Sequence, residues 1–430
     1  MKNTKIILGS LSLFFLPFTL RAQLSLDDCQ QLAEKNYPLL KKYDLIGQTT
    51  QYTVKNIQQG YLPHIAVTGQ ATVQNDVPTL PGALDQMLTA QGMEVKGLKK
   101  DQYRVGVDVD QLIWDGGQIK ARKQLAEAEG KVSNAENEVQ LYALRSRINE
   151  LYFGLLWLDE RIALSQAYGE LLAKSRGRLE ALEKGGMVMG ADVDAVRAEE
   201  LKARQQTRSL LSVQRGWRQV LALFVGKEEA ALQQLVKPKG AGLRGEVNRR
   251  PELQLFDARL QQMDLRTELL NRARYPQISL FARGGYGYPG FDYFEDMFHH
   301  DWKWTAMAGL RLRWDISSFY TQKNERRRLS LLAAEIDNAR EVFLFNNRLQ
   351  TTQQRAEWQR YAQLLSEDDE IVRLRQSVRE SAEKRLEKGV IDVVQLLQEI
   401  TKENEARIER SSHEIEMLKA IYELKYTLNN

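Results

Sequence analysis

The sequence is poor in the residues that build metal sites and disulfides. Its 430 residues include one cysteine, Cys29, and four scattered histidines. A single cysteine excludes a disulfide framework and a cysteine-based zinc site, and the scattered histidines disfavour a histidine-based metal centre. Mean hydropathy is −0.47, which excludes a membrane protein built from many apolar helices. We therefore expect no metal and no cofactor.

An excess of charge of one sign is also lacking. The chain has 61 Lys and Arg residues against 57 Asp and Glu residues. Lys2, Lys5 and Arg21 supply most of the difference, so the chain after residue 22 is close to neutral. Such a chain lacks the basic surface that nucleic-acid binding requires. We also find no nucleophile–base or paired-carboxylate constellation, so we expect neither nucleic-acid binding nor enzymatic activity.

Residues 1–22 have the pattern of a signal peptide. A basic start precedes an apolar run over residues 6–18, and a small residue, Ala22, follows at a cleavage position. The run is shorter than the roughly 20 residues that a membrane-spanning helix needs. We predict a secreted chain that begins near Gln23. Cys29 is badly placed for lipidation, and we expect it to be a small apolar helix residue.

Internal repetition is the most informative feature of the chain. A helical stretch runs from Pro38 to Pro63 in one copy and from Pro251 to Pro276 in the other, with the same spacing between the two prolines. In both copies, a strand, a loop, a second strand, a long helix and a returning helix follow. The sequence therefore predicts an α+β chain made of two structural repeats.

The strands of both copies alternate apolar and polar residues. The clearest apolar positions are Ile65, Val67, Val73, Val105, Val107, Val109, Ala306, Ala308, Leu310 and Leu312. The strand from Ile278 is less regular, because Phe281 falls on its polar side. Each strand has roughly the 9–11 residues that cross a bilayer in a tilted barrel. Four strands cannot close a barrel, so a membrane location requires several chains to share one; two soluble hairpins packed on helices are the alternative.

Charged residues occupy polar positions of these strands. Asp108 and Asp110 belong to the first copy, and Arg311 and Arg313 belong to the second. We expect all four to line a watery barrel interior, because Arg or Lys facing lipid costs about 2–4 kcal/mol at the bilayer midplane. The loop over residues 288–301 is rich in aromatic residues, which suit a membrane interface.

The helices after the strands are unusually long. Residues 118–184 and 321–388 contain no proline, so each could form one helix on the order of 100 Å long. A heptad pattern, which favours coiled-coil packing, runs through Leu141, Leu144, Ile148, Leu151, Leu155, Leu158 and Ile162. Glycine turns at Gly186 and Gly389 end the two helices, and Asp392 has the position of an N-cap.

These features together resemble the TolC-type outer-membrane efflux proteins. The resemblance rests on the duplication, the proline-marked strand starts, the strand end at 112–117, the turn at Gly389-Val390 and the start at 24–38. It implies a homotrimer whose chains share a 12-stranded barrel in the outer-membrane lipid of a Gram-negative bacterium. A coiled-coil barrel would extend into the periplasm. Such channels are passive exit ducts of tripartite efflux pumps or type I secretion systems, and dock with a periplasmic adaptor and an inner-membrane transporter.

The resemblance also implies that the helical tips form the gate. The residues concerned are Gly186, Asp192, Asp194, Arg385, Lys388, Gly389, Gln395 and Gln398. Members of the family often have acids where this chain has Gln395 and Gln398, so the second copy departs from the family's acidic constriction. We expect Asp192 or Asp194 to pair with Arg385 or Lys388 in the closed state. The alternative is a set of exposed helix-end charges worth under about 1 kcal/mol each.

The predicted divisions follow the two repeats. They are a signal peptide (1–22), a helical segment (23–60), a β-hairpin (61–114), a long helical hairpin (115–225), a linker (226–247), a helix (248–273), a second β-hairpin (274–316) and a second helical hairpin with the C-terminal helix (317–430). A periplasmic coiled-coil adaptor or scaffold is the alternative function.

Overall fold

The structure, a computed structural model, describes residues 24–232, 234–240 and 247–429. The predicted signal peptide lies outside the described residues. The chain divides into two compact units, each described below by itself. The sheet unit comprises Lys41–Gln140 and Arg250–Asn346, and the tip unit comprises Met1–Leu40, Leu141–Arg249 and Asn347–Asn430. Among the described residues, no helix combines the length and the apolar character that crossing a membrane demands.

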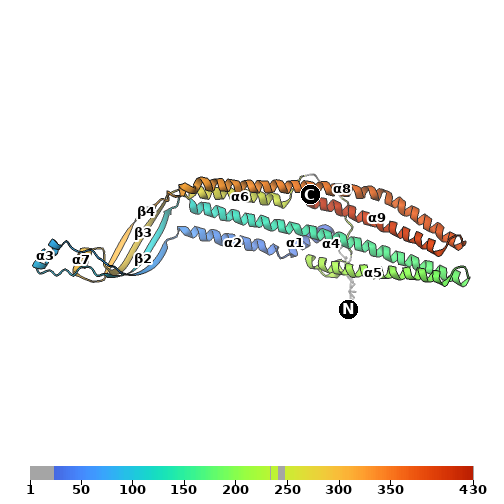
Figure 1. The fold of residues 1–430 in the computed structure, drawn as a ribbon, viewed down its shortest axis with the longest axis horizontal. Helices are drawn as coiled ribbons and strands as arrows, with labels where there is room; N and C mark the ends of the chain where they lie inside the picture. The colour runs from blue at the N-terminus through green and yellow to red at the C-terminus, as the bar shows by residue number, and fades with distance from the viewer. Residues whose placement is uncertain (1–23, 233, 241–246, 430) are drawn as a thin grey trace, which may run out of the picture. The chain divides into compact units, whose positions relative to one another are not determined.

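The sheet unit joins four strands to four helical segments. The strands are β1 (His64–Val73), β2 (Asp101–Trp114), β3 (Gln277–Tyr288) and β4 (Lys303–Arg313). The segments are α2 (Leu40–Gln58), α6 (Pro251–Arg272) and the first parts of α4 (Gln118–Lys184) and α8 (Ser318–Glu387). A short 3₁₀ helix, η1 (Gln59–Tyr61), precedes β1. At the other end of the sheet, the connections contain α3 (Gly82–Ala90) and α7 (Tyr293–Phe298), which the sequence predicted only as loops (Figure 1).

All four strands form one antiparallel sheet in the order β1-β2-β3-β4. The two predicted hairpins are therefore joined, because β2 pairs with β3 and places Asp108 opposite Arg283. One face carries the apolar positions of every strand, including Val67, Val107, Leu280 and Leu310, and the other carries the polar positions. Within the described chain, β1 and β4 each have a single neighbouring strand, so both are open edges.

The tip unit consists of two helical hairpins and a short N-terminal helix. The second part of α4 returns as α5 (Gly190–Val225), and the second part of α8 returns as α9 (Val393–Leu428) (Figure 1). A short 3₁₀ helix, η2 (Glu229–Leu232), follows α5. The N-terminal helix α1 (Leu26–Asn36) ends before Tyr37, whose backbone is extended. The predicted helical segment over 23–60 is therefore two helices, because Pro38 disfavours a helical conformation at the residue before it.

The predicted heptad forms the core of the tip unit. Ile148 and Leu155 are fully buried, together with Tyr152 from the same helix. Residues of α1, α5 and α9 pack against them, including Cys29 and Ile415. Full burial of such side chains contributes about 1.5–3 kcal/mol each. The long helices and their coiled-coil packing are confirmed.

Replacing either of two glycines inside α4 by alanine should change the stability of the protein, in opposite directions for the two positions. A Cβ at Gly154 would collide with the ring of Trp217 on α5, whereas a Cβ at Gly177 would meet nothing within 4 Å. We expect Gly154→Ala to destabilise the protein by about 1–3 kcal/mol, because overpacking outweighs the gain in helix propensity. Gly177→Ala should stabilise it by about 0.5–1 kcal/mol. Thermal unfolding followed by circular dichroism tests the pair, and equal midpoints would show that the Trp217 ring moves freely.

Candidate functional site

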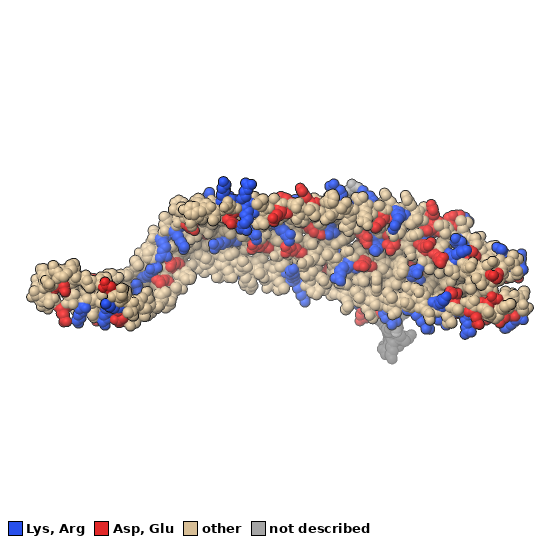
Figure 2. Space-filling model, viewed as in Figure 1, with Lys and Arg blue, Asp and Glu red and all other residues tan. Residues whose placement is uncertain are grey.

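The polar face of the sheet carries a ladder of ion pairs between strands. Asp108 pairs with Arg283 on β3, with Nε 3.2 Å from Oδ1. Asp110 pairs with Arg311 on β4, with Nη1 2.8 Å from Oδ1. Arg313, also on this face, is exposed at the end of β4. The register thus brings the four predicted residues to one face, and Figure 2 shows side chains of both signs together over the strands.

One member of this ladder, Arg283, escaped the sequence analysis. Arg283 follows Phe281 at the polar spacing, but the ring at Phe281 obscured the alternation of β3. The structure explains how that ring fits: its partner on β4 is Gly309, where a Cβ would lie only 3.0 Å from the ring and would crowd it. The Arg311 guanidinium lies 4.7 Å from the ring centroid. Phe281 therefore supports the arginine that pairs with Asp110.

Aromatic residues bracket the apolar face. Trp304 is the second residue of β4 and is 82% exposed, and Trp314 follows the strand and is 53% exposed. Tyr286 lies beside Trp304, with ring centroids 5.2 Å apart, and Trp302 stacks on Tyr103. Such rings at both ends of an apolar band are typical of transmembrane barrels.

The tips of the two helical hairpins have the same turn. Gly186 and Gly389 have positive φ angles of 71° and 66°, which glycine adopts without a steric cost. In each turn the next residue reaches back to a helix carbonyl: Met187 N to Leu182 O at 3.0 Å, and Val390 N to Arg385 O at 2.9 Å. Both helices thus end in a Schellman-type turn that satisfies their last carbonyls.

The carboxylates at the tips cap the returning helices. Asp392 Oδ1 accepts a hydrogen bond of 2.7 Å from the backbone of Gln395, as predicted for an N-cap. In the first copy Asp192 Oδ2 accepts a bond of 3.0 Å from the backbone of Met189, which precedes α5. Each tip therefore uses one half of a capping box. Asp192 thus has a structural role that the sequence analysis missed.

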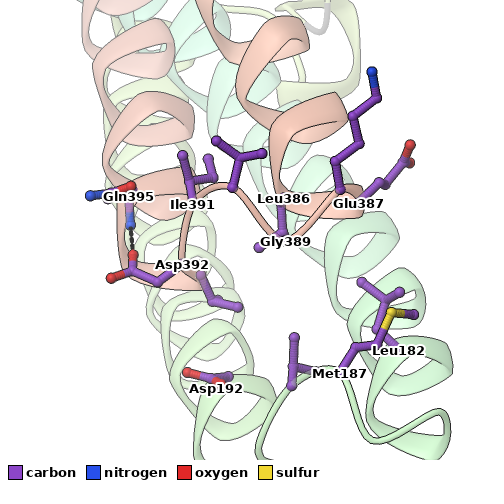
Figure 3. A pocket seen from close by; sticks show the side chains of 13 residues that line it. Leu182, Met187, Asp192, Leu386, Glu387, Gly389, Ile391, Asp392 and Gln395 are labelled. Carbon is purple, nitrogen blue, oxygen red and sulfur yellow. Dashed lines mark hydrogen bonds between the residues drawn. The ribbon is translucent and has the colours of Figure 1, made fainter.

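A hollow of about 690 Å³ lies between the two tips. Leu182 and Met187 line it from the first hairpin, and Leu386 and Ile391 line it from the second (Figure 3). The predicted side chains at Asp194, Arg385, Lys388, Gln395 and Gln398 are exposed. Within the described part of this single chain, neither Asp192 nor Asp194 makes an ion pair with Arg385 or Lys388.

Behind each tip lies the same network of charges. In the first hairpin Arg176 pairs with Glu180 and Glu200, and Glu200 pairs with Arg204. In the second hairpin the residues at the same relative positions, Arg379, Glu383, Glu403 and Arg407, make the same three pairs at 2.7 Å. The spacing Arg-X-X-X-Glu before both turns was the signal that could have revealed it.

One ion pair connects the two hairpins near the tips. Arg178 Nη1 of α4 lies 2.8 Å from Glu383 Oε2 of α8. Burial acts to raise the pKa of Glu383, but hydrogen bonds from Arg379 and Arg178 outweigh burial and leave this pKa below its usual value. Glu383 therefore stays ionised at neutral pH. Sequence reasoning missed Arg178, because nothing in its local pattern distinguishes it from a solvated helix residue.

The described residues hold neither a candidate metal cluster nor a reactive thiol. No group of three or more His, Cys, Asp or Glu residues able to hold a metal ion occurs among them. Cys29 is fully buried, and burial raises the pKa of its thiol to about 12. A thiol in this state is unreactive at neutral pH.

Comparison with known proteins gives structural matches. No model of a known protein family and no curated protein matches this chain. The outer membrane protein VceC from Vibrio cholerae matches with a TM-score of 0.69 and 13% identity, over 94% of this chain and 96% of that one. The CmeC outer membrane channel of Campylobacter jejuni gives 0.65 and 12%, over 94% and 85%. The open state of the MtrE outer membrane channel of Neisseria gonorrhoeae gives 0.63 and 15%, over 94% and 89%. At these identities the matches establish the fold, over nearly the whole chain.

Proposed function

We propose that this chain, which has the fold of outer-membrane channels, is one protomer of a trimeric exit duct. Three chains would each contribute four strands to one 12-stranded barrel in the outer membrane of a Gram-negative bacterium. The helices would continue the duct into the periplasm. There it would serve a tripartite efflux pump or a type I secretion system, and would dock with a periplasmic adaptor and an inner-membrane transporter.

The observation that carries this proposal is a sheet with open edges and opposite faces. The edges β1 and β4 present unpaired backbone groups, which a membrane does not tolerate. Pairing β4 of one chain with β1 of the next satisfies both edges and closes the sheet. The apolar face between its aromatic borders then meets lipid, and the ladder that includes Asp108 and Arg283 faces water. The helices would then be periplasmic, and α3 and α7 would be external.

The gate of this duct would lie at the helical tips. The hollow between the two turns separates the hairpins at their ends, and the Arg178–Glu383 pair holds them together one to two turns behind. We propose that this pair restrains the closed state within a chain. The predicted pairing of Asp192 or Asp194 with Arg385 or Lys388 would then act between neighbouring chains.

Oligomeric mass tests the proposal most directly. We expect the full-length protein, extracted from membranes in mild detergent, to have the mass of three chains after correction for bound detergent. The same sample should form discrete pores in planar lipid bilayers. A monomer that stays soluble without detergent would contradict the duct and would favour the alternative, a periplasmic coiled-coil adaptor.

A further inference from the structure

The two connections at the external end of the sheet fold into one body. Leu98 of the first connection is buried against Met297 of the second and against Tyr288, the last residue of β3. The backbone N–H of Lys96 donates to the carbonyl of Met297 at 3.0 Å. His300 Nε2 lies 2.7 Å from the carbonyl oxygen of Gly97, so it donates to that oxygen. These are ordered, packed segments rather than independent loops.

This body is attached to the polar face of the sheet. Lys303, a polar-face residue of β4, pairs with Glu295 at 2.7 Å and with Asp296 at 3.0 Å, and both carboxylates belong to α7. Asp296 is completely buried. Arg104, a polar-face residue of β2, has its guanidinium 5.8 Å from the ring of Phe291. Ion pairing and ring contact therefore hold α7 and the residues before it over this face.

The cover extends only over the external end of the face. Thr305 and Met307 are successive residues of the polar face on β4. Thr305 is only 9% exposed, whereas Met307 is 43% exposed. Thr305 lies beneath Arg104, which donates a hydrogen bond of 3.2 Å to its hydroxyl and in turn contacts Phe291. The polar face is thus open along the strand and covered at its mouth.

The covering segment exposes three large rings. Phe291, Tyr293 and Phe294 are each more than half exposed, and only Phe294 has a ring partner, Phe298 on the same short helix. We propose that α7 and residues 289–292 form a second constriction, at the external mouth of the duct, which admits narrow solutes and excludes bulky ones. This inference rests on the proposed function, because the polar face must line a duct. Three chains would then bring three sets of rings toward one axis.

This constriction can be tested by labelling a single introduced cysteine. Cys29 is fully buried and unreactive, so a single introduced cysteine reports without interference. Met307→Cys places a thiol on the polar face, just inside the covered mouth. Intact cells that display the full-length protein would be treated from outside with a small charged thiosulfonate or with a maleimide carrying a bulky polymer. The rate of labelling by each reagent is measured.

Two variants of the Met307→Cys protein should open the mouth. Lys303→Gln removes the partner of the buried Asp296 and should release α7. Replacing Phe291, Tyr293 and Phe294 together by alanine removes the rings and leaves the ion pairs in place. In both, labelling by the bulky reagent should rise at least about tenfold, while labelling by the small reagent should stay unchanged. Lys100→Gln is the matched control, because Lys100 bonds Asn75 of the first connection and does not hold α7; its rates should equal those of the parent.

The two reagents separate failure of the inference from failure of the proposed function. If the small reagent reacts but the bulky reagent labels the parent and both variants at the same rate, a duct exists without an external constriction. If the small reagent fails to label Met307→Cys in the parent and in both variants, the polar face does not line a water-filled passage, which overturns the duct itself.

Discussion

Reversing Arg178 to Glu should raise the conductance of the protein in planar bilayers at least about fivefold. The change replaces an attraction to Glu383 by a repulsion between the two hairpins of the chain. Arg178 is largely exposed, so we assign about 1–2 kcal/mol to the whole change, which is a factor of five to thirty in the ratio of open to closed tips. Single-channel recording measures both the open probability and the leak of the closed state.

Three companion variants make this result specific. Arg178→Gln removes the attraction to Glu383 without adding a repulsion, and should raise the conductance less than Arg178→Glu does. Arg373→Glu changes the same kind of residue on α8 at an exposed pair with Glu370, and should leave conductance unchanged. Arg385→Glu tests the pairing predicted from sequence at the tip. A leak from Arg385→Glu alone would place the restraint between neighbouring chains and contradict the role of Arg178.

Removing Arg379 should cause the largest loss of stability among single charge changes. Arg379 is mostly buried and pairs with Glu383 and with Glu403, whose side chain is 5% exposed. Arg379→Gln leaves Glu403 buried with Arg407 as its remaining ion-pair partner. A buried carboxylate that loses a partner is costly, so we expect a loss of about 2–3 kcal/mol, less than the full cost of an unpaired charge.

The same helix supplies the control for this change. Arg373→Gln removes an arginine whose pair with Glu370 is exposed on both sides, so it should cost no more than about 0.5 kcal/mol. Arg176→Gln, the equivalent of Arg379 in the first hairpin, should have an intermediate effect because Arg176 is more exposed. The midpoints of thermal unfolding of the three purified variants measure this order of stability. Equal midpoints for Arg379→Gln and Arg373→Gln would show that the buried network does not stabilise the tips.

Local patterns predicted most of this fold. The helical hairpins were predicted from the heptad through Ile148 and Leu155 and from the glycines at both turns. Both signals are local, because core packing requires apolar residues at heptad spacing and a positive φ favours glycine. The alternation of apolar and polar residues predicted the strands and their two faces. Helical periodicity failed at one place, because it continued through Tyr37, the residue before Pro38, where the structure has a break between α1 and α2. The charged tip residues were found through resemblance, and the structure adds that Asp192 caps α5.

Contacts between distant segments could not be predicted in this way. Arg178 meets Glu383 across two helices, and Lys303 meets Asp296 across a connection that no local period describes. The pairing of Arg283 with Asp108 depends on the register between β2 and β3, which the two hairpins do not specify by themselves. Such contacts follow from tertiary packing, and sequence periodicity reports only the face on which each partner lies.

The charges on the polar face should determine which small ions pass along it most readily. The ladder's two acids are already matched by Arg283 and Arg311, whereas Arg104 and Arg313 have no carboxylate within ion-pair distance among the described residues. In the proposed duct, the strands of each protomer would therefore contribute surplus positive charge to the wall. Fixed charge in a narrow aqueous passage concentrates ions of opposite sign. The strand region would thus carry chloride in preference to potassium, and anionic cargo would meet a favourable potential on its way out.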